Sequence, residues 1–208
     1  LQDCKIHNNT LYDHGSRLTV SRVKQRIRQL LMENELDAPE GTIFAVGAET
    51  ADPHNVGKPA TPVKTGVPII FDIFPQQQAA YWFDTTRTYC VGKPSKRLQT
   101  LYNNVLEAQQ AALDAIKAGV PNKEVANLVC GMFEKNGHKT YHYYTDNNIP
   151  RMSEGFIHGL GHGIGLTIGE PPSLRSYGSD QLKQNHVTTV EPGLYYPEFG
   201  GARLEDVV

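Results

Sequence analysis

Two histidines lie four residues apart in the glycine-rich segment HGLGHGIGLTIGEPP, residues 158–172. The glycines make a stable helix costly, so this spacing does not indicate two side chains on one helical face. A single histidine in a glycine loop is usually structural. A Gly-Ile-Gly run follows His162, however, and so permissive a backbone can bring an imidazole close to a crowded polar centre. Whether His162 belongs to such a centre depends on the acids elsewhere in the chain.

Four acidic residues lie in or beside apolar, strand-like segments: Asp72, Asp84, Glu191 and Glu205. Any one of them alone could be a solvated acid on an exposed strand face or the partner of a nearby arginine. Carboxylates are rarely buried without a compensating charge, and four in sheet-like segments need several positive charges nearby. Arg87 and Arg203 could neutralise two of the four. A pair of divalent cations would neutralise all of them.

Four carboxylates and one imidazole form a ligand set that is mostly oxygen with one nitrogen. Such a set suits Mn²⁺, Fe²⁺, Co²⁺ or Zn²⁺ better than a structural zinc site lined by thiolates. Two metals that share bridging carboxylates lie about 3.5–4 Å apart and can hold a hydroxide ready to attack a carbonyl. The acids and His162 therefore predict a dinuclear hydrolytic centre.

The elements that must position these residues follow from the hydrophobic pattern. In the first half of the chain the pattern predicts a helix from Ser16 to before Asp37, a buried strand at 42–46, an extended loop up to Pro68, and a hairpin of strands at 69–74 and 81–91. In the second half it predicts a helix at 95–118, a helix capped by Asn122 and ended at Gly137, and strands at 187–190, 194–196 and 202–208. A helix followed by a strand pair with two acids thus occurs twice. The pattern favours an α+β fold whose two similar halves face each other across a shared sheet.

Composition excludes several other classes of protein. The 208 residues carry a formal net charge of −2, which gives no electrostatic reason to expect a nucleic acid or an anionic membrane as partner. No apolar run approaches the roughly 20 residues that a membrane span needs. The three cysteines are far apart and odd in number, which favours reduced thiols in a reducing compartment. We therefore expect a cytoplasmic globular protein.

Five motifs resemble those of the pita-bread metallopeptidases, the family of methionine aminopeptidase, Xaa-Pro aminopeptidase, prolidase and creatinase. They are Ala51-Asp-Pro-His-Asn55, Asp84-Thr-Thr-Arg-Thr88, His158-Gly-Leu-Gly-His-Gly-Ile-Gly165, Glu191-Pro-Gly-Leu-Tyr195 and Gly201-Ala-Arg-Leu-Glu-Asp206. Each motif alone is weak, but all five occur in the family's order over nearly the whole chain. The last two motifs resemble the Xaa-Pro aminopeptidase and prolidase branch.

The resemblance implies a single catalytic domain over 1–208, with a curved, mostly antiparallel sheet covered by helices. It implies a dinuclear exopeptidase that releases the N-terminal residue of an Xaa-Pro peptide or dipeptide through a metal-bridging hydroxide. Two divalent ions are expected, manganese before cobalt, zinc or iron, and a homodimer is expected by resemblance alone. We also expect this sequence to be an excerpt of a longer chain that carries an N-terminal domain.

The resemblance also assigns the five ligands of the two metals. It implies that Asp72 chelates one metal, whereas His162 and Glu191 serve the other. Asp84 and Glu205 would bridge the two ions.

Further roles carry over from the same motifs to residues in the cleft. Glu191 would shuttle a proton to the leaving nitrogen. His54 and His158 would contact the substrate or the developing oxyanion, and Arg203 would orient the substrate or the acid beside it.

The chain departs from the family pattern at two places. The gap from Asp72 to Asp84 is one residue longer than usual, which a longer turn at 76–79 could absorb. Relatives commonly read Gly-Leu-x-x-His-Glu where this chain reads Gly-Leu-Thr-Ile-Gly169-Glu170. If position 169 lies at the cleft, the missing histidine predicts a slow peptidase that Gly169→His would accelerate. If Gly169 has φ > 0, a histidine would instead strain the backbone.

The sequence leaves two other functions open. A catalytically impaired or non-enzymatic binding module could keep this fold and its metals. A creatinase-like hydrolase could act on another amide or amidine.

Overall fold

One three-stranded antiparallel sheet forms the first half of the computed structural model, which describes residues 3–77 and 80–208. Its strands are β5 (Thr42–Val46), β6 (Ile69–Ile73) and β8 (Thr85–Tyr89), with β6 in the middle. All five residues of β5 are buried, as its apolar run from Ile43 to Val46 predicts. In this register Asp72 lies opposite Thr86.

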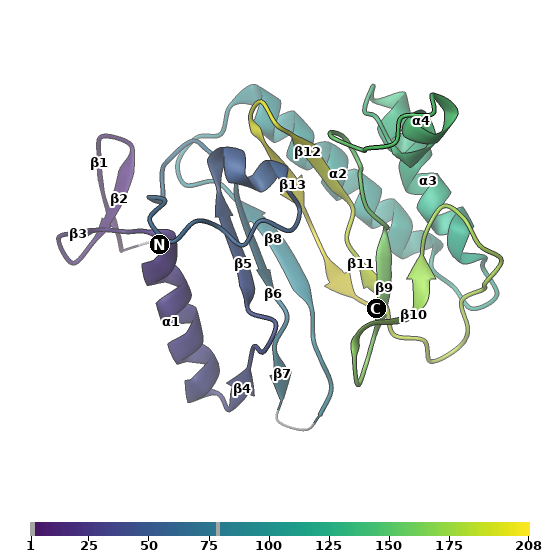
Figure 1. Cartoon of the computed structure of the whole chain (residues 1–208), viewed down its shortest axis with the longest axis horizontal. Helices are drawn as coiled ribbons and strands as arrows, with labels where there is room; N and C mark the ends of the chain where they lie inside the picture. The colour runs from purple at the N-terminus through teal and green to yellow at the C-terminus, as the bar shows by residue number, and fades with distance from the viewer. Residues whose placement is uncertain (1–2, 78–79) are drawn as a thin grey trace.

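Three antiparallel strand pairs form the second half. They are β9 (Gly161–Ile164) with β10 (Ile168–Leu174), β11 (Thr189–Val190) with β14 (Asp206–Val207), and β12 (Gly193–Tyr196) with β13 (Gly200–Arg203). Figure 1 shows β5, β6 and β8 beside β13 and β12. The two halves are joined where the Glu205 amide donates to the Thr86 carbonyl at 3.0 Å and the Thr88 hydroxyl donates to the Arg203 carbonyl at 2.8 Å.

Helices cover both halves. In the first half, α1 (Val20–Glu33) packs beside β5 and buries Val20, Ile27 and Leu31 (Figure 1). In the second half, α2 (Lys96–Ala115) and α3 (Asn122–Lys135) supply most of a larger apolar core with Leu160, Leu174 and Leu194. A short helix, α4 (Tyr141–Asp146), follows α3. The predicted α+β arrangement of two helix-covered halves is confirmed.

Smaller elements complete the fold. They are the meander β1 (Lys5–His7), β2 (Thr10–Asp13) and β3 (Ser16–Arg17), the pair β4 (Leu36–Asp37) and β7 (Gln76–Gln77), and the 3₁₀ helix η1 (Gly47–Ala51). Within the described residues, no helix is both long enough and apolar enough to cross a membrane.

Several predicted boundaries were wrong, each for a local reason. The first helix begins at Val20 rather than Ser16, because Ser16 and Arg17 pair with β2. The predicted loop up to Pro68 begins with η1. Asn122 does not cap α3: it is the first helical residue, and its side-chain amide donates to the Ser173 carbonyl at 3.1 Å.

The predicted hairpin strands are also shorter than expected. A strand was expected at 81–91, but β8 covers only residues 85–89. Before it, Trp82 forms a single antiparallel bridge with Gln76. The longer turn expected at 76–79 includes residues 78 and 79, which lie outside the described residues.

Candidate metal centre

One cavity of about 520 Å³ gathers every residue that the sequence assigns to a site. Those residues are His54, Asp72, Asp84, His158, His162, Glu191, Arg203 and Glu205. They come from segments up to 151 positions apart in the chain, so only the fold brings them together. The cavity's remaining lining includes aromatic and apolar side chains such as Phe74, Phe156 and Tyr177.

The imidazole of His162 lies among the carboxylates. Its Nε2 is 3.8 Å from Asp84 Oδ2 and 3.6 Å from Glu191 Oε1. Asp84, His162 and Glu205 each offer one ligand atom, and these three atoms lie within 4.8 Å of one another. Asp72 lies outside this group of three and instead contacts Arg203. The three grouped side chains could hold one ion without a rearrangement of the backbone.

The glycines that flank His162 allow two strands to approach it closely. A Cβ atom at Gly161 would lie 2.0 Å from the Thr189 carbonyl oxygen, and one at Gly163 would lie 2.3 Å from the Pro171 carbonyl oxygen. Real side chains do not tolerate such distances, so only glycine fits at either position. The glycine-rich segment is thus a strand packed between β10 and β11, and not a loop that curls around the site.

The carboxylates are buried without enough positive charge beside them. Asp72, Asp84 and Glu205 are at most 7% exposed, and the buried cation at the site is Arg203. Among the described residues, Asp72 Oδ1 and Asp84 Oδ1 have no hydrogen-bond partner. Buried carboxylate oxygens without donors are costly. A divalent cation would satisfy both the charge and the open oxygens, so this donor set fits the predicted metals.

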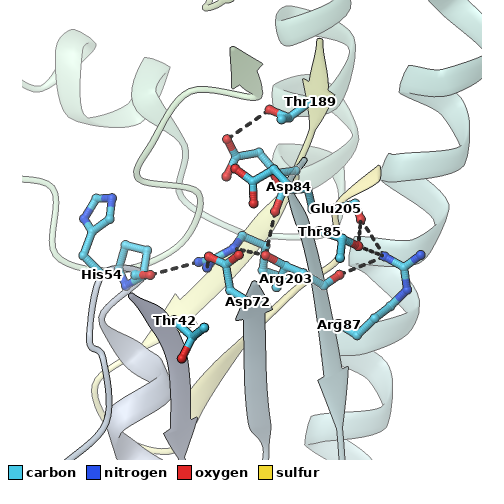
Figure 2. Close-up of polar contacts among 12 residues, drawn as sticks. Thr42, His54, Asp72, Asp84, Thr85, Arg87, Thr189, Arg203 and Glu205 are labelled. Atoms are coloured by element: carbon cyan, nitrogen blue, oxygen red, sulfur yellow. Dashed lines mark hydrogen bonds and ion pairs between the residues drawn. The ribbon is translucent and has the colours of Figure 1, made fainter. Parts of the chain in front are cut away.

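Arg203 anchors one side of the site (Figure 2). Its guanidinium donates to Asp72 Oδ2 at 2.6 Å, to the Tyr195 hydroxyl at 3.0 Å and to the Thr86 hydroxyl at 3.1 Å. A further bond reaches the Pro53 carbonyl, next to His54. Arg203 thus contacts Asp72, the acid beside it, and its two expected roles stay predictions.

Arg87 does not neutralise any of the four acids, contrary to the expectation that it could. Its guanidinium pairs with Asp206 Oδ1 at 2.5 Å. It also donates to the carbonyl oxygen of Glu205 (Figure 2). It therefore contacts the backbone of Glu205 rather than its carboxylate.

The hydrogen bonds around His158 determine its protonation. Arg203 can only donate, so the Tyr195 hydroxyl accepts from it and donates its own proton to His158 Nε2, 2.8 Å away. The other ring nitrogen then carries the proton and donates to the Gly159 carbonyl at 2.7 Å. Burial, followed by the charge of Arg203, lowers the pKa of His158 to about 3, which agrees with a neutral ring. A substrate contact from His158 Nε2 would require its bond with Tyr195 to break.

The acids in the cavity bind protons more tightly than usual when no metal is present. Burial, followed by the charge of Glu205, raises the pKa of Asp84 and also that of Glu191. Burial, followed by the charge of Asp72, raises the pKa of Glu205 to about 7. In the folded, metal-free protein Asp84 therefore favours its neutral form near pH 7, whereas Glu205 titrates near that pH.

A pH dependence of stability follows for the metal-free protein. A carboxyl whose pKa is raised on folding stabilises the fold below its unfolded pKa of about 4.3, and this stabilisation is lost as the pH rises through the folded pKa. For Glu205 this stabilisation is therefore lost between about pH 4.3 and about pH 7. We expect the melting temperature in a chelator to fall between pH 5 and pH 8, and added Mn²⁺ to reduce the fall. A chelated protein that melts higher at pH 8 would contradict this charge arrangement.

Gly169 adopts the conformation in which a side chain would be strained. Its φ is +81°, and an added Cβ would meet nothing within 4 Å. Among the described residues, the cavity lining includes Ile168 and Ser173 but not Gly169. The positive φ therefore favours the expectation that a histidine at position 169 would strain the backbone.

We therefore expect Gly169→His to fold, because its Cβ has room, but to lose about 1–2 kcal/mol of stability from the left-handed backbone. No gain in peptidase turnover is expected, because the new side chain would start outside the cavity lining. A thermal melt and a rate measurement on the same sample check both points. A faster variant would show that residue 169 reaches the reacting groups.

Three residues with polar contacts to the site were missed by the sequence analysis. Thr86 donates to Glu205 Oε2 at 2.7 Å, Thr189 donates to Glu191 Oε1 at 3.4 Å, and Tyr195 lies between Arg203 and His158. A signal existed for Thr86, because it follows Asp84 by two positions and strand residues two apart share a face. Tyr195 belongs to a quoted motif but had no assigned role.

Comparisons with known proteins show the family of this chain. Residues 4–208 match metallopeptidase family M24. The Xaa-Pro dipeptidase of Pyrococcus furiosus is 34% identical over 187 residues, which are 89% of this chain and 49% of that protein. The solved prolidase from Pyrococcus furiosus superposes with a TM-score of 0.80 at 34% identity, over 92% of this chain and 52% of the other.

A more distant structure supports the fold alone. Methionine aminopeptidase from Rickettsia prowazekii superposes with a TM-score of 0.73 at 17% identity, over 92% of this chain and 82% of that chain. The expected pita-bread architecture is therefore confirmed. The chain spans about half the length of the curated relatives that it matches.

Proposed function

Because this chain belongs to metallopeptidase family M24, we propose that it is a dinuclear metal-dependent exopeptidase that releases the N-terminal residue of Xaa-Pro peptides or dipeptides. The observation that carries this proposal is the cavity in which four carboxylates meet one imidazole, with two buried carboxylate oxygens left without donors. The similarity to a protein named Xaa-Pro dipeptidase supports the choice of substrate.

The five proposed ligands are Asp72, Asp84, His162, Glu191 and Glu205. Mn²⁺ is the preferred ion, because the set is mostly carboxylate oxygen with one imidazole nitrogen. The bound metals would supply an activated water and polarise the scissile carbonyl. The apolar part of the cavity, with Phe74 and Phe156, would exclude bulk water from the scissile bond.

The chain's own residues would handle the proton and the orientation of groups. Glu191 is half-buried beside His162, and Thr189 holds its Oε1, so a proton taken up by this carboxylate could pass to the leaving nitrogen. Arg203 would keep Asp72 in place through their bond of 2.6 Å. His54 lies at the edge of the cavity with an exposed side chain, where it would contact the substrate (Figure 2).

Hydrolysis of defined peptides tests the proposal. Metal-free protein, reloaded with Mn²⁺, would be assayed on a Xaa-Pro dipeptide, a longer Xaa-Pro peptide and matched peptides with alanine at the second position. We expect release of the first residue from the proline peptides, and no release after chelation. Equal rates on the alanine peptides would overturn the proline specificity. Metal binding without hydrolysis of any peptide would overturn the exopeptidase function.

That last outcome would favour a binding module that keeps the fold and its metals. The observation behind this second candidate is Gly169, which supplies no side chain where relatives commonly have a histidine. A protein that binds Mn²⁺ and Xaa-Pro peptides without cleaving them would fit this candidate. Hydrolysis of another amide or amidine would instead support a creatinase-like hydrolase.

The histidines outside the ligand set give a further prediction. We expect His54→Ala to lower turnover by about 10²-fold if its imidazole contacts the oxyanion, with unchanged metal content. His158→Ala should also keep its metal, because this side chain bonds to Tyr195 and Gly159 rather than to the carboxylates. Activity and metal content would be measured on the same folded samples. Loss of metal from either variant would contradict the division between ligands and cleft residues.

A homodimer and a cytoplasmic location stay predictions. The first rests on the family resemblance alone, and the second on the three widely separated cysteines. Sedimentation of the purified protein would test the first.

A further inference from the structure

Alternate residues of one strand face the segment that carries Glu205. Asp84 immediately precedes β8, and Thr86 and Thr88 follow at intervals of two, so the three side chains share one face of the strand. The Thr88 hydroxyl bonds the backbone of Arg203, donating to its carbonyl and accepting from its amide. Thr86 lies between them, fully buried, and contacts side chains instead.

The chemistry of its neighbours fixes the direction of the Thr86 hydroxyl. Arg203 Nε lies 3.1 Å from Thr86 Oγ1 and can only donate to it. The hydroxyl proton is then free to point at Glu205 Oε2, which is 2.7 Å away and accepts it when the carboxylate is ionised. Threonine is also stiff about χ1, so the hydroxyl oxygen keeps one well-defined position beside Glu205.

We propose that Thr86 is a positioning residue that holds the Glu205 carboxylate in the orientation needed to bind metal. The inference rests on the metal centre of the proposed function. Glu205 is 2% exposed, so no bulk water is available to replace the hydroxyl as donor. The backbone supports the same alignment, because the Glu205 amide donates to the Thr86 carbonyl at 3.0 Å. Side chains that orient a metal ligand in this way typically account for about 10–100-fold in metal affinity.

The test compares variants that differ by one hydroxyl group. Thr86→Val removes the hydroxyl and keeps the shape of the side chain, whereas Thr86→Ser keeps the hydroxyl. Thr88→Val is the matched control, because it removes a hydroxyl from the same face of the same strand that bonds only to the backbone. Metal-free samples would be titrated with Mn²⁺ by calorimetry and with Co²⁺ by visible absorption.

We expect Thr86→Val to bind metal about 10-fold more weakly, or worse, with an altered Co²⁺ spectrum. Thr86→Ser should recover most of the affinity, and Thr88→Val should bind metal like the unchanged protein even if it melts at a lower temperature. Unchanged affinity in Thr86→Val, or equal losses in Thr86→Val and Thr88→Val, would overturn the inference. If Thr86→Val does not fold, Thr86→Ala and Thr86→Ser form a second pair that differs by one oxygen.

Metal binding by the wild-type protein separates this inference from the proposed function. If it binds neither Mn²⁺ nor Co²⁺, the metal centre itself is wrong. If it binds them and Thr86→Val does so equally well, only the role of Thr86 is wrong. A double-mutant cycle with Glu205→Gln, measured as unfolding free energy in a chelator, adds a readout without metal. Purely additive effects in that cycle would mean that the two side chains do not interact.

Discussion

Glu205→Ala should lose most of its bound metal and, with it, the proposed peptidase activity. The Glu205 carboxylate lies within 4.8 Å of ligand atoms from Asp84 and His162, and it is 2% exposed. Loss of a group that merely supports a ligand already weakens metal binding by about 10–100-fold, so loss of the ligand itself should exceed that range. The expected effect is therefore more than about 100-fold in affinity and a comparable loss of turnover.

Loss of the Glu205 charge alone, in the variant Glu205→Gln, should act in the opposite direction on the metal-free protein. Burial, followed by the charge of Glu205, raises the pKa of Asp84 and of Glu191, so a negative charge on Glu205 opposes the ionisation of both. Glu205→Gln removes the charge and keeps the volume. We expect this variant to melt at the same temperature as the unchanged protein in a chelator, or higher, but to gain less from added Mn²⁺.

Metal analysis of dialysed protein and melting curves with and without Mn²⁺ measure both effects. Glu198→Ala is the matched control, because Glu198 is exposed and pairs with Arg97 on the surface. It should keep its metal and its activity. A Glu205→Ala protein with a full metal complement would remove Glu205 from the ligand set.

The fold was most predictable where a strand is buried on both faces. Thr42 to Val46 and Ile69 to Ile73 are continuous apolar or β-branched runs apart from one acid, and the structure has strands there. The strands β9 and β10 were missed because they contain glycines and prolines in place of β-branched residues. Contacts from Thr189 and Pro171 hold them in place, and contacts between distant segments leave no local pattern in the sequence.

The site residues were predictable from their types, but their pairing was not. Arg87 and Arg203 each follow or precede an acid by two or three positions, so both were reasonable partners. Strand parity places Arg87 on the opposite face of its strand from Asp84, three residues away. Arg203 pairs with Asp72, which lies in a distant segment, and no local pattern indicates that pair. Bonds such as that from Thr86 to Glu205 join residues 119 positions apart and required the fold.

Arg203→Met should be the most destabilising single substitution at the site in the metal-free protein. Arg203 is 3% exposed and Asp72 is 7% exposed, so the substitution would leave a buried carboxylate without its cation. Removal of one partner from a buried ion pair typically lowers the unfolding free energy by about 3–5 kcal/mol. Arg203→Lys should recover little, because an ammonium group lacks the planar fork that reaches Asp72, Tyr195 and Thr86 together.

Denaturant titration in a chelator would measure these losses, and a second substitution would assign their cause. Asp72→Asn removes the charge that Arg203 compensates, so the double variant Arg203→Met with Asp72→Asn should lose clearly less than the sum of the two single variants. Arg97→Met provides the control, because its exposed pair with Glu198 should contribute only about 0–1 kcal/mol. Strictly additive losses would show that Arg203 stabilises the fold through packing and its other hydrogen bonds. The charge balance proposed for the cavity would then be wrong, because Asp72 would tolerate burial without its arginine.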